Sequence, residues 1–209
     1  MDEATRALVT LSAALAAGDP AVLGPAMDAA ARAAPAEAVE EALLQSHLFL
    51  GYPTALRALG LWRERSGRPA SAASTDGPAD WRARGEAVCA QVYGGAYERL
   101  RENVARLHPD VERWMVEDGY GRVLGRPGLD LRRRELCIVA MLAGLAAPQQ
   151  LHSHLRGALN VGASPEDVAE TLELAGEMAP PARRAQAWRV WDEVRERWVE
   201  RRAGGQGSR

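Results

Sequence analysis

The sequence is poor in the residues that mark disulfide-rich, β-rich and nucleic-acid-binding proteins. Of its 209 residues, 2 are cysteines, 5% are aromatic and none is lysine. Cys89 and Cys137 lie far apart, which argues against a disulfide framework and favours reduced thiols in the cytoplasm. The scarcity of aromatic and β-branched runs argues against a sheet. The formal net charge of −2 lacks the one-sided basic excess that binding to nucleic acid needs.

Targeting and membrane signals are also scarce. The first residues, "MDEATRAL", lack the basic flank and apolar stretch of a secretory signal. The longest apolar stretch, Leu136 to Pro148, is shorter than the ~20 residues of a membrane span and contains Gly144. The sequence therefore predicts a cytoplasmic protein with neither a membrane nor a nucleic acid as partner.

Helix-forming residues dominate what is present. Ala, Leu, Arg and Glu are abundant, and together they predict an all-α chain. Turn residues divide the chain at "GDP" (18–20), "GYP" (51–53), "GRPGLD" (125–130), "GASPED" (162–167) and "APP" (179–181). Ser164, followed by Pro165 and two acids, predicts a capped helix start.

The two ends of the chain resemble each other at an offset of 129 residues. Residues 39–65 align with 168–194, with Val39 on Val168 and Trp62 on Trp191. Two alanine-rich amphipathic helices can match by composition alone, but the shared Trp and Glu positions favour a true repeat. We expect a degenerate internal repeat whose halves pack about a pseudo-twofold axis.

This repeat suggests how the chain is organised. Residues 1–65 form the amino-terminal half-repeat, and the Ser-, Gly-, Ala- and Pro-rich stretch 66–80 reads as a linker. Residues 81–202 form a core that packs on the first half as one unit. The Gly-rich end, 203–209, is predicted to be a disordered tail.

The stretch "RPGLDLRRRELCIVAMLAGLAAPQQLHSHLRGALNVGASPEDVAETL", residues 126–172, resembles the carboxymuconolactone decarboxylase family. The sequence before it resembles that family's amino-terminal helices, and residues 42–59 resemble its closing helix pair. The resemblance implies an alkylhydroperoxidase D-like (AhpD-like) helical fold that assembles into homo-oligomers, trimers or hexamers, and uses no cofactor or metal.

The family holds two chemistries, lactone decarboxylation and thiol peroxidation. In the peroxidase branch a Glu opens the buried helix and a Cys-x-x-Cys-x-x-x-His motif follows. Glu135 and His154 stand at the glutamate and histidine positions, whereas Ala147 and Gln150 stand at the cysteine positions. A dithiol peroxidase needs one thiol to attack and a second to resolve the sulfenic acid. The sequence therefore argues against a dithiol peroxidase.

Glu135 and His154 are the candidate catalytic residues that the resemblance implies. The helix dipole and the neighbouring Arg133 and Arg134 can stabilise the charge of Glu135. On residue type alone, a solvated acid or the partner of a buried arginine is as good an interpretation as a catalytic acid. His154 shares a helix face with Leu155 and Ala158, where a histidine bonded to a backbone carbonyl is the ordinary alternative.

Neighbouring cations are candidates for substrate binding. His152 lies about 200° around the helix from His154, so the two cannot form a metal pair, whereas His152 and Arg156 share a face. In the decarboxylase scheme Arg156 or Arg134 orients the substrate anion, and His152 joins this binding set. His47 is a further candidate for proton transfer. The amino-terminal copy has Arg6 and Pro25 at the catalytic positions and is expected to hold no site.

The leading hypothesis is a lyase that acts on a small anionic cyclic acid or lactone by Glu135–His154 proton transfer. A second keeps peroxidase (peroxiredoxin) activity, with Cys137 or Cys89 as the single nucleophile. A third is an oligomeric binding protein of this family whose catalytic site has decayed. Thiol reactivity and lactone turnover discriminate among the three.

Overall fold

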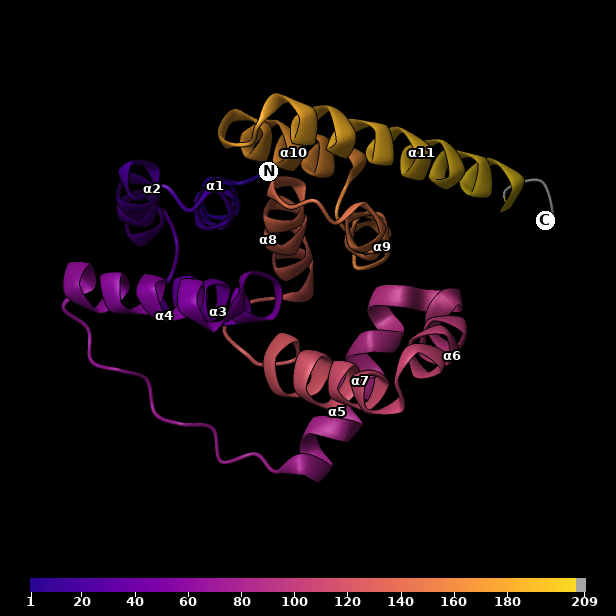
Figure 1. The fold of residues 1–209 in the computed structure, drawn as a ribbon, viewed down its shortest axis with the longest axis horizontal. Coiled ribbons are helices and arrows are strands. Elements are labelled where there is room, and N and C mark those ends of the chain that lie inside the picture. The colour runs from indigo at the N-terminus through magenta and orange to yellow at the C-terminus, as the bar shows by residue number, and fades with distance from the viewer. Residues whose placement is uncertain (206–209) are drawn as a thin grey trace.

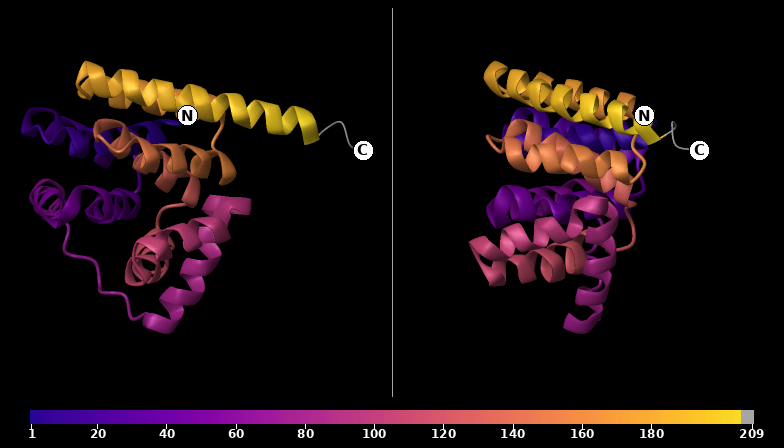
Figure 2. Two further views of the ribbon diagram at one scale, coloured as in Figure 1. Left: turned by 45° about the vertical axis from the view of Figure 1, so that its right-hand side comes forward. Right: turned by 90° about the vertical axis from the view of Figure 1, so that its right-hand side faces the viewer.

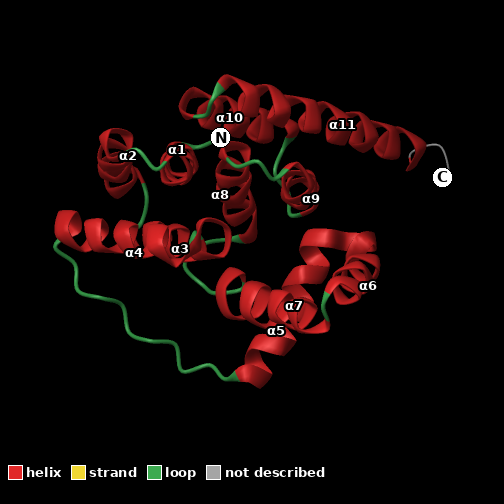
Figure 3. Ribbon diagram, viewed as in Figure 1, coloured by secondary structure: helices red, strands yellow, loops and turns green. Residues whose placement is uncertain are grey.

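The computed structural model describes residues 1–205, with side chains through 202, and this part of the chain is helical with no strand (Figures 1 and 3). This confirms the predicted all-α class. The first four helices are α1 (Glu3–Ala17), α2 (Pro20–Ala33), α3 (Ala36–Gln45) and α4 (His47–Ser66). The middle of the chain forms α5 (Pro78–Tyr93), the 3₁₀ turn η1 (Gly94–Ala96), α6 (Tyr97–Leu107), α7 (Pro109–Trp114) and the π-helix η2 (Met115–Leu124). The last four are α8 (Leu131–Gly144), α9 (Pro148–Asn160), α10 (Pro165–Met178) and α11 (Pro181–Gly205).

Helix α8 runs through the middle of the molecule, with α1, α9 and α10 packed around it (Figure 1). Every residue from Arg134 to Ala143 is buried. A helix that is apolar on all sides can be stable only where neighbours cover all of its faces. The apolar run that the sequence places here therefore becomes the centre of the core, and any polar residue on it must find a partner inside the protein.

Two hydrophobic clusters meet at α8. One joins most of α8 to α5, η2, α9, α10 and α11, and its buried members include Leu136, Leu155 and Trp191. The other joins α1 to α4, includes Leu43 and Trp62, and reaches α8 through Cys137. Figure 2 shows the resulting stack, with α11 lying along one side of the molecule and α5 crossing the other.

The helix bounds recur along the chain at the offset of 129 residues. Shifted by that number, α1, α2 and α3 coincide within a few residues with α8, α9 and α10. The aligned pairs Val39 and Val168, and Trp62 and Trp191, are all buried. Arg6 and Pro25, at the positions equivalent to the candidate catalytic residues, are exposed. The pseudo-twofold axis and the oligomeric assembly stay predictions.

Helices α5 and η2 pack so closely that their backbones are in contact. A Cβ atom at Gly85 would lie 2.0 Å from the carbonyl oxygen of Val116, and one at Gly121 would lie 1.9 Å from that of Trp81. Only glycine allows such an approach, because any Cβ would overlap a backbone atom that cannot move aside. The guanidinium of Arg84 adds a 2.7 Å hydrogen bond to the carbonyl of Gly121.

The turn signals in the sequence coincide with the ends of helices. Gly18 and Gly67 end α1 and α4 in the left-handed conformation, and Ser164 caps α10 in a reciprocal capping box with Asp167. At "GYP" the chain kinks within α4, because Gly51 has a φ of 78°. No helix among residues 1–205 combines the length and the apolar character that crossing a bilayer requires.

The loop and the tail differ slightly from the expected bounds. The loop between α4 and α5 covers 67–77, inside the predicted linker 66–80. Helix α11 ends at Gly205, so residues 203–205 of the predicted disordered tail are helical instead. Once a helix is formed, each added residue gains one backbone hydrogen bond, which lets α11 extend through Ala203. The rest of the predicted tail, 206–209, lies outside the described residues.

One carboxylate ties this loop to the helices before it. Glu40 accepts hydrogen bonds from Arg63 at 2.6 and 3.0 Å and from the indole nitrogen of Trp62 at 3.1 Å, and it also binds the Ser71 hydroxyl. The Arg63 guanidinium lowers the pKa of Glu40 to about 2 from an ordinary value of 4.5. Because the folded-state pKa is depressed, the stabilisation is complete above pH 4.5 and is lost as the pH falls towards about 2.

We therefore expect Glu40→Gln to lower the free energy of unfolding at neutral pH and to lose less stability on acidification than the wild type. Urea unfolding at neutral pH and near pH 2 measures the difference. Glu64→Gln is the control, because Glu64 follows Arg63 on α4, is exposed, and forms no ion pair within the described chain. Equal acid sensitivity of the Glu40→Gln protein and the wild type would contradict this role.

Candidate functional site

Glu135 and His154 form a buried pair at the junction of α8 and α9. Nδ1 of His154 lies 2.9 Å from Oε2 of Glu135, which is hydrogen-bond distance for an N–H donating to a carboxylate. Glu135 is 1% exposed and His154 is 7% exposed. The structure thus brings together the two residues that the sequence singles out, although 19 positions separate them.

Local sequence places both side chains. Asp130 caps α8 by accepting the backbone N–H of Arg133, so that Glu135 lies in the second helical turn, inside the core. Pro148 opens α9, whose apolar face carries His154 inward. Gly157 completes the fit: a Cβ atom there would lie 2.6 Å from Oε2 of Glu135 and 2.7 Å from Cγ1 of Val92. The missing side chain leaves the space that the carboxylate occupies.

The second ring nitrogen of His154 remains free for chemistry. With Nδ1 on Glu135, Nε2 makes no hydrogen bond to any described residue, and it is not among the fully buried polar atoms that lack a partner. Nε2 is therefore the nitrogen that retains solvent contact. The Phe49 ring lies edge-on to the imidazole at a centroid distance of 5.4 Å, held there by the part of α4 that precedes the kink at Gly51. An apolar ring thus borders the imidazole of His154.

The arginines next to Glu135 in sequence do not contact it. Arg133 binds Thr5, Asp2 and Asp130. Arg134 turns towards α3, where it donates a 2.8 Å hydrogen bond to Glu41. Its other two guanidinium nitrogens donate to the carbonyl of Leu129 at 3.0 Å and to the side chain of Gln45 at 3.3 Å. The prediction that Arg134 binds substrate is not supported, because its guanidinium is 1% exposed and already satisfied.

Arg156 and His152 lie on the other side of α9 from His154. Residues two apart on a helix point about 200° away from each other, and these two face α6 and α11 instead of α8. Within one chain they do not join the Glu135–His154 pair, so the predicted substrate-binding set is divided. They line a hollow of about 200 Å³, which we call the arginine hollow; its lining residues are Arg99, His152, Arg156, Val194, Arg197 and Arg201.

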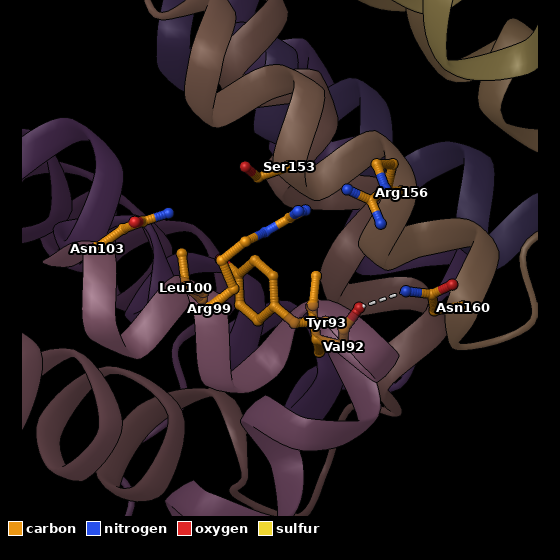
Figure 4. A pocket seen from close by; sticks show the side chains of 9 residues that line it. Val92, Tyr93, Arg99, Leu100, Asn103, Ser153, Arg156 and Asn160 are labelled. Carbon is orange, nitrogen blue, oxygen red and sulfur yellow. Dashed lines mark hydrogen bonds between the residues drawn. The ribbon is translucent and has the colours of Figure 1, made fainter. Parts of the chain in front are cut away.

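A second hollow, of about 130 Å³, opens between α9, α6 and the end of α5 (Figure 4). We call it the tyrosine hollow, because Tyr93 lines it together with Val92 and Asn160, and it shares Arg99 and Arg156 with the arginine hollow. Asn160 donates a 2.8 Å hydrogen bond to the carbonyl of Val92, which ties α9 to α5. Val92, which lines this hollow, also lies beside Gly157 next to the Glu135 carboxylate.

Two tyrosines, Tyr93 and Tyr120, form a hydrogen-bonded pair next to the tyrosine hollow. The hydroxyl of Tyr120 donates to that of Tyr93 at 3.0 Å, and their rings meet edge to face. Burial raises the pKa of both phenols, and the charge of Glu135 adds to the increase. Both tyrosines therefore stay neutral and act as hydrogen-bonding groups at neutral pH.

Neither cysteine is placed for thiol chemistry. Cys89 and Cys137 are both buried and free. Burial raises the pKa of Cys89 to about 12 and that of Cys137 to about 11. A thiol with such a pKa carries almost no thiolate at neutral pH, and the thiolate is the nucleophile. The single-cysteine peroxidase hypothesis finds no support in the structure.

His47 is held by its own helix junction. Its Nδ1 lies 2.7 Å from the carbonyl oxygen of Leu44, and its ring packs against Tyr52.

Sequence reasoning missed Phe49, Tyr93 and Gly157 as parts of the site. Gly157 carried a signal, because a glycine inside a helix often marks a close approach by another group. In the described residues no three His, Cys, Asp or Glu side chains gather as a metal site would need.

The buried thiols lead to a direct expectation. In the native protein at neutral pH, a thiol reagent should label neither Cys89 nor Cys137 within the time that labels both after denaturation. The two thiols of the denatured protein give the full signal and serve as the control. Rapid labelling of either cysteine in the folded protein would contradict the burial and restore the peroxidase hypothesis.

The close contact at Gly157 predicts a second result. Gly157→Ala should lower the free energy of unfolding by roughly 1–3 kcal/mol, because the new methyl group overlaps Glu135 and Val92. Gly60→Ala is the matched control: it lies in α4 with open space around it and should be neutral or stabilising. Chemical denaturation of both variants tests the expectation, and equal stability of the two would show that Gly157 does not make room for the carboxylate.

Comparison with known proteins adds the family. Residues 109–193, which run from α7 into α11 and include both Glu135 and His154, match the model of the carboxymuconolactone decarboxylase family. The chain is 30% identical over 74 residues to the 4-carboxymuconolactone decarboxylase of Acinetobacter baylyi, an alignment that covers 35% of this chain and 55% of that protein.

A second relative aligns over a longer stretch. The chain is 27% identical over 145 residues to Peroxisomal protein 2 of Schizosaccharomyces pombe, which covers 68% of each protein. The family match includes the buried helix, the histidine helix and the capped helix after them, which are the segments that carried the sequence resemblance. Residues 109–193 therefore match the carboxymuconolactone decarboxylase family, as the sequence resemblance predicted.

Proposed function

We propose that Glu135 and His154 are the proton-transfer pair of a carboxymuconolactone decarboxylase-like lyase that acts on a small anionic cyclic acid or lactone. The observation that carries the proposal is the 2.9 Å hydrogen bond between a buried carboxylate and a histidine that keeps Nε2 free. The family match over both residues supports it. This chemistry needs no thiol, in agreement with the buried state of both cysteines.

The proposed reaction has one proton to deliver. Cleavage of the bond between the ring carbon and the carboxylate releases carbon dioxide, and the electron pair delocalises into the conjugated lactone carbonyl. The Nε2–H of His154 then protonates the carbon, and solvent returns the proton to the ring. Glu135 accepts the Nδ1–H bond throughout, which fixes the orientation of the ring. The nearby Phe49 ring limits water at the reacting carbon.

The cation that places the substrate carboxylate must come from outside this pair. Arg134 is engaged by Glu41, and Arg156 and His152 face away from His154. The family resemblance implies assembly of several copies, so we place Arg156 and His152 of a neighbouring copy against the substrate carboxylate. A guanidinium suits this task because it binds a carboxylate through two parallel hydrogen bonds.

One observation favours a different function. Glu135 is 1% exposed and lines neither the tyrosine hollow nor the arginine hollow, which fits a binding protein that keeps the pair for stability alone. In that case the protein would bind small anions without turning them over. Turnover by the purified protein separates the two functions.

The direct test is turnover of a panel of carboxylated lactones, followed by carbon dioxide release. His154→Asn and Glu135→Gln should each lower kcat by at least about 100-fold, the usual contribution of a positioned acid or base. His108→Asn is the matched control, because His108 is exposed and caps α7, and asparagine can cap a helix equally well. The absence of turnover with every lactone, or full activity in His154→Asn, would refute the lyase.

Mixing experiments test the neighbouring-copy part of the proposal. Arg156→Gln should raise KM, and His154→Asn should lower kcat, when each variant is assayed alone. When the two variants are unfolded together and refolded, some sites combine an intact His154 with an intact Arg156, so that activity should return. Failure of the mixture to recover activity would place the substrate cation elsewhere.

A further inference from the structure

The arginine hollow gathers positive charge from three helices. Arg99 comes from α6, His152 and Arg156 from α9, and Arg197 and Arg201 from α11. Val194 contributes an apolar surface between them. Figure 4 shows Arg99 and Arg156 extending towards each other across the adjoining tyrosine hollow. Side chains of like charge repel, so their convergence without a counter-charge has an energetic cost.

The described residues do not supply that counter-charge. Other arginines of this protein pair with acids, as Arg63 does with Glu40 and Arg101 with Glu112. Within the described chain, none of the four arginines in the hollow forms an ion pair or a hydrogen bond with a carboxylate. Glu193 is the acid whose charge acts on His152, and it is exposed.

Arg156 has a buried nitrogen without a hydrogen-bond partner in the described part of the chain. Its Nε is fully buried and has no hydrogen-bond partner among the described residues. A buried donor without a partner costs free energy, so such an atom in a native structure indicates a ligand or a water. Burial lowers the pKa of Arg156, and the charges of Arg201, Arg99 and Arg197 lower it further. Burial also lowers the pKa of His152, with Arg156 and Arg197 adding to the effect.

We infer that the arginine hollow is a binding site for a small oxyanion that carries two or more negative charges, of the phosphate or carboxylate class. Guanidinium groups bind both classes through paired N–H···O bonds, and several converging guanidinium groups favour a multiply charged ligand over chloride. A volume of about 200 Å³ limits the occupant to a small molecule or to the anionic end of a larger one.

The arginine hollow shares Arg156 and His152 with the substrate cations proposed above, but anion binding there does not depend on catalysis by Glu135 and His154. The hollow lies on the opposite side of α9 from His154. The site therefore stands whether the protein turns over a lactone or only binds a ligand. It also extends the predicted binding pair, Arg156 and His152, by three arginines that the sequence did not single out.

The test measures anion affinity in two variants of equal charge. Arg201→Gln removes a residue of the hollow, whereas Arg202→Gln removes the next arginine, which does not line it. The pair is closely matched because both guanidinium groups lie over the Trp198 ring, at 5.8 and 5.9 Å from its centroid. Titration calorimetry with inorganic pyrophosphate and with citrate, each against sodium chloride at equal ionic strength, distinguishes a phosphate-type ligand from a carboxylate-type ligand.

We expect pyrophosphate or citrate to bind the wild type and the Arg202→Gln protein equally. The Arg201→Gln protein should bind it about tenfold more weakly, because one charge-assisted hydrogen bond is lost. Nuclear magnetic resonance should show the pKa of His152 rising when the anion binds, because a nearby negative charge favours the imidazolium. Equal affinity of the two variants, or heat no larger than that from sodium chloride, would overturn the inference.

Discussion

The burial of α8 on every side is the constraint on which the rest of the structure depends. A helix with no solvent face cannot leave a polar side chain without a partner, because an unpaired buried charge is far more costly than a paired one. Arg134 and Glu135 are consecutive on this helix, and both are almost fully enclosed. Arg134 reaches Glu41 on α3, and Glu135 reaches His154 on α9. The same desolvation therefore joins α8 to the amino-terminal helices and to the helix that carries the imidazole.

This origin explains why the Glu135–His154 bond serves both stability and chemistry. Removal of either partner leaves the other as a buried polar group without a hydrogen-bond partner, which is costly. The pair would therefore persist even without a substrate. What makes it suitable for proton transfer is its asymmetry. The carboxylate is enclosed, whereas Nε2 on the far edge of the imidazole retains contact with solvent. The enclosed half fixes the orientation, and the open half can exchange a proton.

Local features could be predicted from the sequence, and tertiary partners could not. The all-α class, the breaks at Gly18 and Gly51 and the Ser164 cap follow from residues close together in the chain. The pairing of Glu135 with His154 needed the family resemblance, because spacing across a hairpin does not determine which side chains meet. The helical period already placed Arg156 away from His154. No sequence pattern indicated that Glu41, from α3, satisfies the neighbouring arginine.

The contact between α5 and η2 has a consequence for the carboxylate that lies some distance away. Helix α5 also supplies Val92, the side chain that closes the space beside Gly157 and Glu135. The absence of a side chain at Gly85 and Gly121 lets α5 settle at the depth where Val92 reaches that space. A bulkier residue at either glycine would push the helix outward and admit water behind the acid. The enclosure of Glu135 thus depends on two residues that never touch it.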